Sequence, residues 1–192
     1  MAGLNLVKGQ KVDITKGANL REIAIAAGWD IAGGADGSYD LDIFLVGLDA
    51  SNNPIPNKVV FFNQKDGIGG CQLDGDNLTG EGDGDDETIT INIPAIEPSV
   101  ESLVFAINIF DAASKNQNFG MVRNAYVRVY NKENQQELVK FDLSEDYGTN
   151  TAVVAGKLYK HNEEWKFQAM GEGLVGNIND VVAKTAEITA KF

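Results

Sequence analysis

Short runs of alternating apolar and polar residues, separated by turn-forming residues, constrain the fold of this chain more than any other feature. Successive side chains of a β-strand point to opposite faces, so alternation over about four to eight residues is typical of strands. Glycine, asparagine and aspartate separate the runs, as at Asn53-Pro54. We therefore predict about ten strands, at residues 11–15, 22–26, 41–48, 58–62, 88–93, 103–110, 126–130, 137–142, 152–159 and 165–170.

The last stretch of the chain changes to a helical period. Asn177 or Asn179 could cap the start of a helix there. We expect one C-terminal amphipathic helix within residues 177–192, with its apolar stripe packed on the rest of the protein. The residues at helical spacing are Ile178, Val181, Val182, Thr185 and Ile188. This pattern predicts an all-β protein, an antiparallel β-sandwich forming a single domain over residues 1–192.

Composition and charge argue against a membrane span and against a nucleic-acid surface. No stretch approaches the roughly 18 apolar residues of a membrane-spanning helix, and no signal peptide is visible at the N-terminus. The formal net charge is −12, whereas nucleic-acid binding needs a basic stripe. We therefore expect a cytoplasmic protein. The single cysteine, Cys71, rules out an intrachain disulfide and is expected to be a buried free thiol.

The negative charge is concentrated in one glycine-rich segment, residues 74–87. Glycines let the chain turn tightly, and carboxylate, amide and hydroxyl groups supply the hard oxygens of which calcium takes about six to eight. We predict a calcium-binding loop, with a solvated acidic loop as the alternative. The acidic residues of this segment, which contains no basic residue, are Asp74, Asp76, Glu81, Asp83, Asp85, Asp86 and Glu87.

The strand that follows this loop supports the prediction. Ile89 and Ile91 alternate and should face the core, and the same parity puts Glu87 and Asp85 on that inward face. A bare carboxylate is costly to remove from water. A cation at the end of the sandwich would offset that cost.

A second acidic strand end precedes the predicted strand at 41–48. Asp40 and Asp42 share parity with the apolar Phe44 and Val46. Their carboxylates would stand about 7 Å apart and repel by roughly 2 kcal/mol at an effective dielectric near 20. This pair is either a solvated strand end or a second segment that converges on the same metal cluster.

Other motifs do not fit the acidic segment. An EF-hand starting at Asp74 would need an oxygen ligand where Leu78 stands and a glycine where Thr79 stands. Acidic side chains would repel the anion of a phosphate-binding loop. The sequence also shows no cationic clamp near the motif, which counts against a hydrolase.

Several segments strongly resemble the TerD family of tellurium-resistance and stress proteins. The resemblance covers roughly residues 4–176 in order, and the 13-residue acidic motif at 75–87 is highly specific. The segments that carry it are 8–10, 28–30, 40–42, 75–87, 118–125 and 159–167. Departures from the family pattern are Ile43-Phe44, where Ala-Ser usually follows the Asp-Leu-Asp motif, and Leu78, where arginine is usual.

The resemblance implies a calcium-binding β-sandwich with two neighbouring calcium ions held by loops at one end. It further implies a cytoplasmic bacterial protein that acts in membrane-associated protein complexes, with no established enzymatic activity. By match to the family motifs, the expected ligands are Asp40, Asp42, Asp76, Asn77, Asp83, Asp85, Asp86 and Glu87. Further candidates are Asp30, Thr79, Glu81 and Asp111.

The function that follows is a calcium-binding, non-catalytic stress-response module linked to tellurite and chemical stress resistance. It would act as a calcium-dependent scaffold or binding protein for protein partners. One alternative is a metal-dependent hydrolase that uses paired calcium or magnesium ions to activate water. Another is a module that docks on anionic membranes with calcium, for which Leu78 is a candidate apolar contact.

Overall fold

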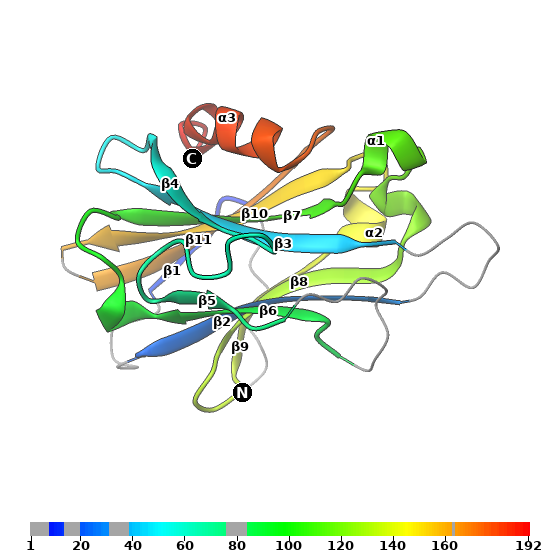
Figure 1. Ribbon diagram of the computed structural model, residues 1–192. Helices are drawn as coiled ribbons and strands as arrows, with labels where there is room; N and C mark the ends of the chain where they lie inside the picture. The colour runs from blue at the N-terminus through cyan, green and yellow to red at the C-terminus, as the bar shows by residue number, and fades with distance from the viewer. Residues whose placement is uncertain (1–7, 14–19, 31–38, 76–83, 163) are drawn as a thin grey trace.

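Two antiparallel sheets packed face to face make up most of the protein (Figure 1). The computed structural model describes residues 8–13, 20–30, 39–75, 84–162 and 164–192. The larger sheet has six strands in the order β1-β11-β10-β7-β3-β4. Its strands are β1 (Lys11–Asp13), β3 (Leu41–Leu48), β4 (Pro54–Val60), β7 (Ser102–Ile109), β10 (Ala152–His161) and β11 (Glu164–Leu174).

The second sheet has five strands in the order β5-β6-β2-β8-β9. It begins at an edge strand that the sequence did not predict, because β5 is only three residues long and lies between glycine-containing segments. Its central strand is longer than predicted and carries an irregularity between Gly28 and Asp30. The strands are β2 (Glu22–Asp30), β5 (Cys71–Leu73), β6 (Glu87–Asn92), β8 (Arg123–Asn131) and β9 (Glu137–Asp142).

The centre of the six-stranded sheet is buried on both faces, which explains why β3 is almost entirely apolar. Leu41, Ile43 and Leu45 belong to the core between the two sheets. Phe44 and Val46 belong to a separate apolar layer on the opposite face. That outer layer lies beneath α3 (Ile178–Thr189), which crosses above the sheet (Figure 1).

The C-terminal helix begins where the sequence predicted. The Asn177 side chain accepts hydrogen bonds from the backbone N–H groups of Asn179 and Asp180, and the Asp180 carboxylate accepts one from the Asn177 N–H. This reciprocal cap satisfies donors that a helix start otherwise leaves unpaired. Val181 is fully buried and Ile188 nearly so, and burial of each contributes about 1.5–3 kcal/mol. The predicted β-sandwich with one C-terminal amphipathic helix is therefore confirmed.

Short helical turns complete the fold. They are α1 (Ala112–Lys115), α2 (Leu143–Asp146), η1 (Ile93–Ala95) and η2 (Phe119–Met121). Among the described residues, no helix has the length and apolar character needed to cross a membrane. Cys71 is buried as predicted, and burial raises the pKa of its thiol to about 12.

Candidate metal centre

Glu87, the first residue of β6, places its side chain between the two sheets. It has the same parity as Ile89 and Ile91, and only 1% of its surface is exposed. Its Oε2 atom accepts a hydrogen bond of 2.9 Å from the backbone N–H of Ile43 in β3. The predicted inward orientation of Glu87 is confirmed. A single carboxylate thus links the first strand after the acidic loop to the opposite sheet.

Asp85, two residues earlier, turns the other way. Its carboxylate accepts two hydrogen bonds from Arg128, at 2.8 Å from Nε and 2.6 Å from Nη2. The Tyr126 hydroxyl donates a third at 2.9 Å. Both partners alternate with the core residues of β8, so they lie on the outer face of the five-stranded sheet. Strand parity therefore gave the wrong face for Asp85, because residue 85 precedes the strand and the pair with Arg128 decides its direction.

These contacts also change the proton affinities of the partners. The hydrogen bonds from Arg128 to Asp85 raise the pKa of the guanidinium. Burial, followed by the hydrogen bond to Asp85, raises the pKa of the Tyr126 hydroxyl. Arg128 thus stays charged and Tyr126 stays a hydrogen-bond donor at any physiological pH. The strand β8 thus brings a cation to the motif from 43 residues away in the sequence, but this cation is already paired with Asp85.

Asp86 is held at the end of β2 by the backbone. Its Oδ2 atom accepts a hydrogen bond of 2.8 Å from the N–H of Trp29, and its own N–H donates to the carbonyl of Ala27. Burial raises the pKa of its carboxyl, and the negative charges of Asp30 and Asp85 raise it further. The charges of Asp30 and Asp85 therefore lie close enough to Asp86 to disfavour ionisation of its carboxyl.

Gly28 makes this close approach of the loop to β2 possible. A Cβ atom at this position would lie 2.4 Å from the carbonyl oxygen of Gly84 and 2.5 Å from the Tyr126 hydroxyl. Only glycine leaves room for both groups. Asp30, two residues further along β2, accepts a hydrogen bond of 2.5 Å from the Asn124 side chain. Gly28, Asn124, Tyr126 and Arg128 were missed as site residues. For the last three, the only signal in the sequence was their shared parity in β8, opposite to that of its core residues.

The second acidic strand end lies on a different face. Asp42 shares a face of β3 with Phe44, beneath α3, and lines a pocket with Phe110, Asp111 and Ile178. Glu87 approaches β3 from the inter-sheet side, at Ile43. The structure therefore does not bring the side chains of Asp42 and Glu87 together. Asp40 is partly exposed, and its carbonyl accepts a hydrogen bond from the Phe110 N–H.

The chemistry of the donor set fits calcium at the loop end, although the described residues do not form a complete site. Within the described ranges, no three His, Cys, Asp or Glu side chains form a metal-binding group. Asp85, Asp86 and Glu87 nevertheless directly follow Gly84, where the described chain resumes, and Asp30 lies near Asp86. Asp76, Asn77, Thr79, Glu81 and Asp83 lie outside the described residues, so their expected role stays a prediction.

Comparison with known proteins identifies relatives along nearly the whole chain. The TerD domain profile matches residues 1–184. General stress protein 16U of Bacillus subtilis (strain 168) is 44% identical over 181 residues, covering 91% of this chain and 93% of that protein. The tellurium resistance protein TerD of Serratia marcescens is 38% identical over 185 residues, covering 94% and 96%.

Solved structures share the fold. The Streptomyces coelicolor A3(2) protein SCO6318, described as a homologue of telluride resistance protein (TerD), superposes with a TM-score of 0.73 at 21% identity. The superposition covers 85% of this chain and 95% of that one. A crystal structure of SAV2460, described as a protein of unknown function, gives a TM-score of 0.74 at 24% identity. These likenesses show that proteins with 21–24% sequence identity to this chain share its β-sandwich fold.

Proposed function

Because this chain belongs to the TerD family of tellurium-resistance and stress-response proteins, we propose that it is a calcium-binding, non-catalytic module of the bacterial stress response. Its metal site is the acidic segment at 74–87. The observation that carries the proposal is the position of Asp86 within that segment, where burial and the nearby charges of Asp30 and Asp85 raise the pKa of its carboxyl. A carboxyl whose ionisation is disfavoured in this way gains from a divalent cation.

Different carboxylates have different roles in this proposal. Asp86 and Glu87 would provide oxygens from the structured side of the site, with Asp30 next to them. Asp76, Asn77, Thr79, Glu81 and Asp83 would provide the rest of the about six to eight oxygens that each of two calcium ions takes. Asp85 is bound by Arg128 and Tyr126, so it would anchor the loop end rather than depend on the metal. Asp40 and Asp42 remain ligand candidates through the family resemblance alone.

Calcium would act by shifting the protein toward the conformation that binds it more tightly. A metal ion that binds one arrangement of the carboxylates more tightly than others stabilises that arrangement and the surface it presents. A protein partner that recognises this surface would then bind in a calcium-dependent way. The module would bind a protein partner in the cytoplasm, as part of a membrane-associated stress complex, and would not catalyse a reaction.

Thermal melts of matched variants test the metal site. Calcium at about 100 times its dissociation constant should stabilise the wild-type chain by about 2.7 kcal/mol. Asp83→Asn should remove most of this gain. Glu133→Gln removes one negative charge from an exposed turn elsewhere and should keep the gain. Full stabilisation of Asp83→Asn by calcium would refute the site.

A metal-dependent hydrolase is the second candidate, and one observation favours it. A cavity of about 330 Å³ lies at the same end of the sandwich, lined by Asp30, Asn124, Tyr126 and Lys140 among others. Lys140 Nζ lies 3.9 Å from the centre of the Tyr126 ring, so a cation stands near the carboxylates. Turnover of a generic phosphodiester that follows calcium or magnesium occupancy and is lost in Asp86→Asn would support this candidate over the binding module.

A further inference from the structure

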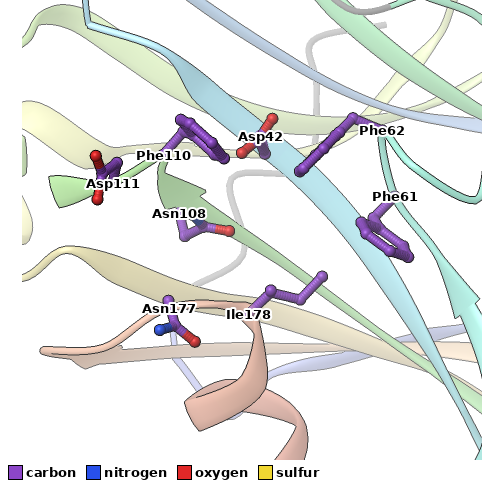
Figure 2. A pocket seen from close by; sticks show the side chains of 8 residues that line it. All are labelled: Asp42, Phe61, Phe62, Asn108, Phe110, Asp111, Asn177 and Ile178. Carbon is purple, nitrogen blue, oxygen red and sulfur yellow. The ribbon is translucent and has the colours of Figure 1, made fainter.

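The outer face of the six-stranded sheet, which α3 partly covers, is acidic at one end and basic at the other. At the acidic end, where β3 begins and β7 ends, a pocket of about 260 Å³ contains two charged side chains, Asp42 and Asp111. Figure 2 shows them together with the phenylalanine side chains that line the same pocket, Phe61, Phe62 and Phe110. Both aspartates are already candidate calcium ligands. The other end of this face has the opposite charge.

Lysines of β1 and β10 flank a glutamine of β11 at that basic end. Lys11 pairs with Gln168, and Gln168 pairs with Lys157, so the three residues form one row across strands that lie side by side (Figure 1). Val104, the partner of Lys157 in β7, belongs to the apolar layer beneath α3, which identifies the face. Neighbouring strands lie about 4.8 Å apart, so about 10 Å separates the backbones of Lys11 and Lys157. Their long, flexible side chains can therefore reach one common ligand.

A second row on the same face adds a third lysine. Lys166 of β11 lies between Asp13 of β1 and Tyr159 of β10. The two rows together hold three ammonium groups and one carboxylate, in a chain whose formal net charge is −12. Among the residues that the structure describes, none of the three lysines forms an ion pair. We call Lys11, Lys157 and Lys166 the lysine patch.

Lys157 is half-buried and has a neutral partner. Its ammonium donates a hydrogen bond to the side-chain oxygen of Asn52 and lies 5.7 Å from the centroid of the Tyr159 ring. Burial lowers the pKa of this ammonium, and the positive charge of Lys11 lowers it further. A partly buried cation beside a second cation is costly without a counter-charge. An anion bound at the lysine patch would offset that cost.

Other lysines near these strands differ, because the fold supplies carboxylates for them. Lys8 and Lys191 both pair with Glu172, at 2.8 and 2.7 Å. Lys160 pairs with Glu101 at 3.7 Å. The positive charges around the lysine patch are therefore balanced within the protein, whereas those of the patch itself are available to a ligand.

A phosphate group fits the lysine patch better than other ligands. It carries about 1.5–2 negative charges near neutral pH and presents several acceptor oxygens, and lysine is a common binder of phosphate. A carboxylate brings one charge for three ammonium groups. A metal ion would be repelled by the ammonium groups, and a long nucleic acid would be repelled by the net charge of −12.

We propose that the lysine patch binds a phosphate group, from either a small phosphorylated molecule or a lipid headgroup. The three ammonium groups of the patch donate hydrogen bonds to its oxygens. The site is separate from the candidate metal ligands of β3. Val46 pairs with Val104, so the row of Lys157 lies four residues along β3 from Asp42, or about 13 Å. Binding here does not require calcium, so this proposal and the proposed function can fail independently.

Titration calorimetry of the full, metal-stripped chain with pyrophosphate tests the proposal, and sodium chloride at the same ionic strength is the control. Pyrophosphate should bind saturably, at millimolar concentration or below. Chloride, which only screens charges, should give no saturable heat. Absence of saturable pyrophosphate binding would overturn the proposal. Because no calcium is present, the result does not depend on the proposed function.

Two variants and a matched control locate the binding. Lys157→Gln keeps a hydrogen-bond donor but removes the charge, and should weaken pyrophosphate binding at least about tenfold. Lys11→Gln, at an exposed position, should weaken it about two- to fivefold and keeps the test valid if Lys157→Gln does not fold. Lys184→Gln removes one positive charge from the exposed side of α3 and should bind pyrophosphate normally. Unchanged binding in both Lys157→Gln and Lys11→Gln, or equal weakening in Lys184→Gln, would contradict the proposal.

Vesicle sedimentation distinguishes the two sources of the phosphate group. The vesicles contain phosphatidylcholine alone or phosphatidylcholine with phosphatidic acid, and no calcium is present. Sedimentation with phosphatidic acid that both pyrophosphate and Lys157→Gln abolish would support a lipid headgroup. Pyrophosphate binding without sedimentation would support a small phosphorylated molecule.

Discussion

Asp85 and Asp86 are adjacent in sequence but lie in opposite electrostatic surroundings. Asp85 turns to the outer face of the five-stranded sheet, where Arg128 and Tyr126 donate three hydrogen bonds to it. Asp86 faces the end of β2, where burial and the charges of Asp30 and Asp85 raise the pKa of its carboxyl. The difference shows that one acidic segment contains two kinds of carboxylate. One has its cation supplied by Arg128, and we propose that the other binds a cation supplied from outside.

The largest effect on stability without metal is expected at Asp85. Asp85→Ala would leave the Arg128 guanidinium, whose side chain is 25% exposed, without its bidentate partner. The cost should be about 1.5–3 kcal/mol, because hydrogen bonds to charged groups are strong and the guanidinium would keep only the longer 3.8 Å contact with Glu137. Urea unfolding in EDTA measures this cost.

Asp74 provides the matched control for that measurement. It forms a more exposed pair with Lys132 at 3.3 Å, with side chains 45% and 36% exposed. Asp74→Ala should cost about 1 kcal/mol or less. Equal costs for the two variants would show that the Arg128 pair does not anchor the loop end.

Asp86 should respond in the opposite sense. Asp86→Asn keeps an acceptor for the Trp29 N–H but removes a charge that Asp30 and Asp85 disfavour. Stability in EDTA should therefore be unchanged or slightly higher. The gain from calcium, about 2.7 kcal/mol at 100 times the dissociation constant, should largely disappear. Thermal melts of Asp86→Asn with EDTA and with calcium measure its stability without metal and its gain from calcium. A large loss of stability in EDTA would show that Asp86, like Asp85, stabilises the protein without metal.

The smallest effect on calcium affinity is expected at Arg128. Arg128→Lys keeps the positive charge but cannot form the two parallel hydrogen bonds to Asp85. The free energy of unfolding in EDTA should fall by about 1 kcal/mol, and the calcium affinity should stay unchanged within about threefold. A strong fall in calcium affinity would mean that the guanidinium fixes the geometry of the metal ligands directly.

Alternation along a strand and the capping residue of a helix were sufficient to predict several elements. The bounds of β3 and β9 agree with prediction, and the cap at Asn177 was one of two expected. Phe61 and Phe62 were placed in a strand that ends at Val60, because apolar residues that line a pocket look like strand residues. An apolar run indicates that side chains are buried, and side chains are buried both in a strand and in the wall of a pocket.

The candidate site was predicted less completely because its decisive contacts are long-range. Parity correctly put Asp42 with Phe44, but β3 is covered on both faces, so alternation could not tell which face meets the other sheet. Alternation within a strand also could not predict the contact between Arg128 and Asp85. That contact depends on the order of the strands, in which β2 lies between β6 and β8. The acidic segment itself was visible from the sequence alone, since its seven acidic residues lie within 14 consecutive positions without a basic residue.

The most direct test of calcium binding is calorimetric titration of the metal-stripped wild-type chain with calcium, with magnesium as the control. We expect about two calcium ions per chain, much weaker binding of magnesium, and a large calcium-dependent rise in melting temperature. Absence of binding at millimolar calcium would contradict the account. The acidic segment would then be a solvated loop anchored by Asp85 and Arg128 alone.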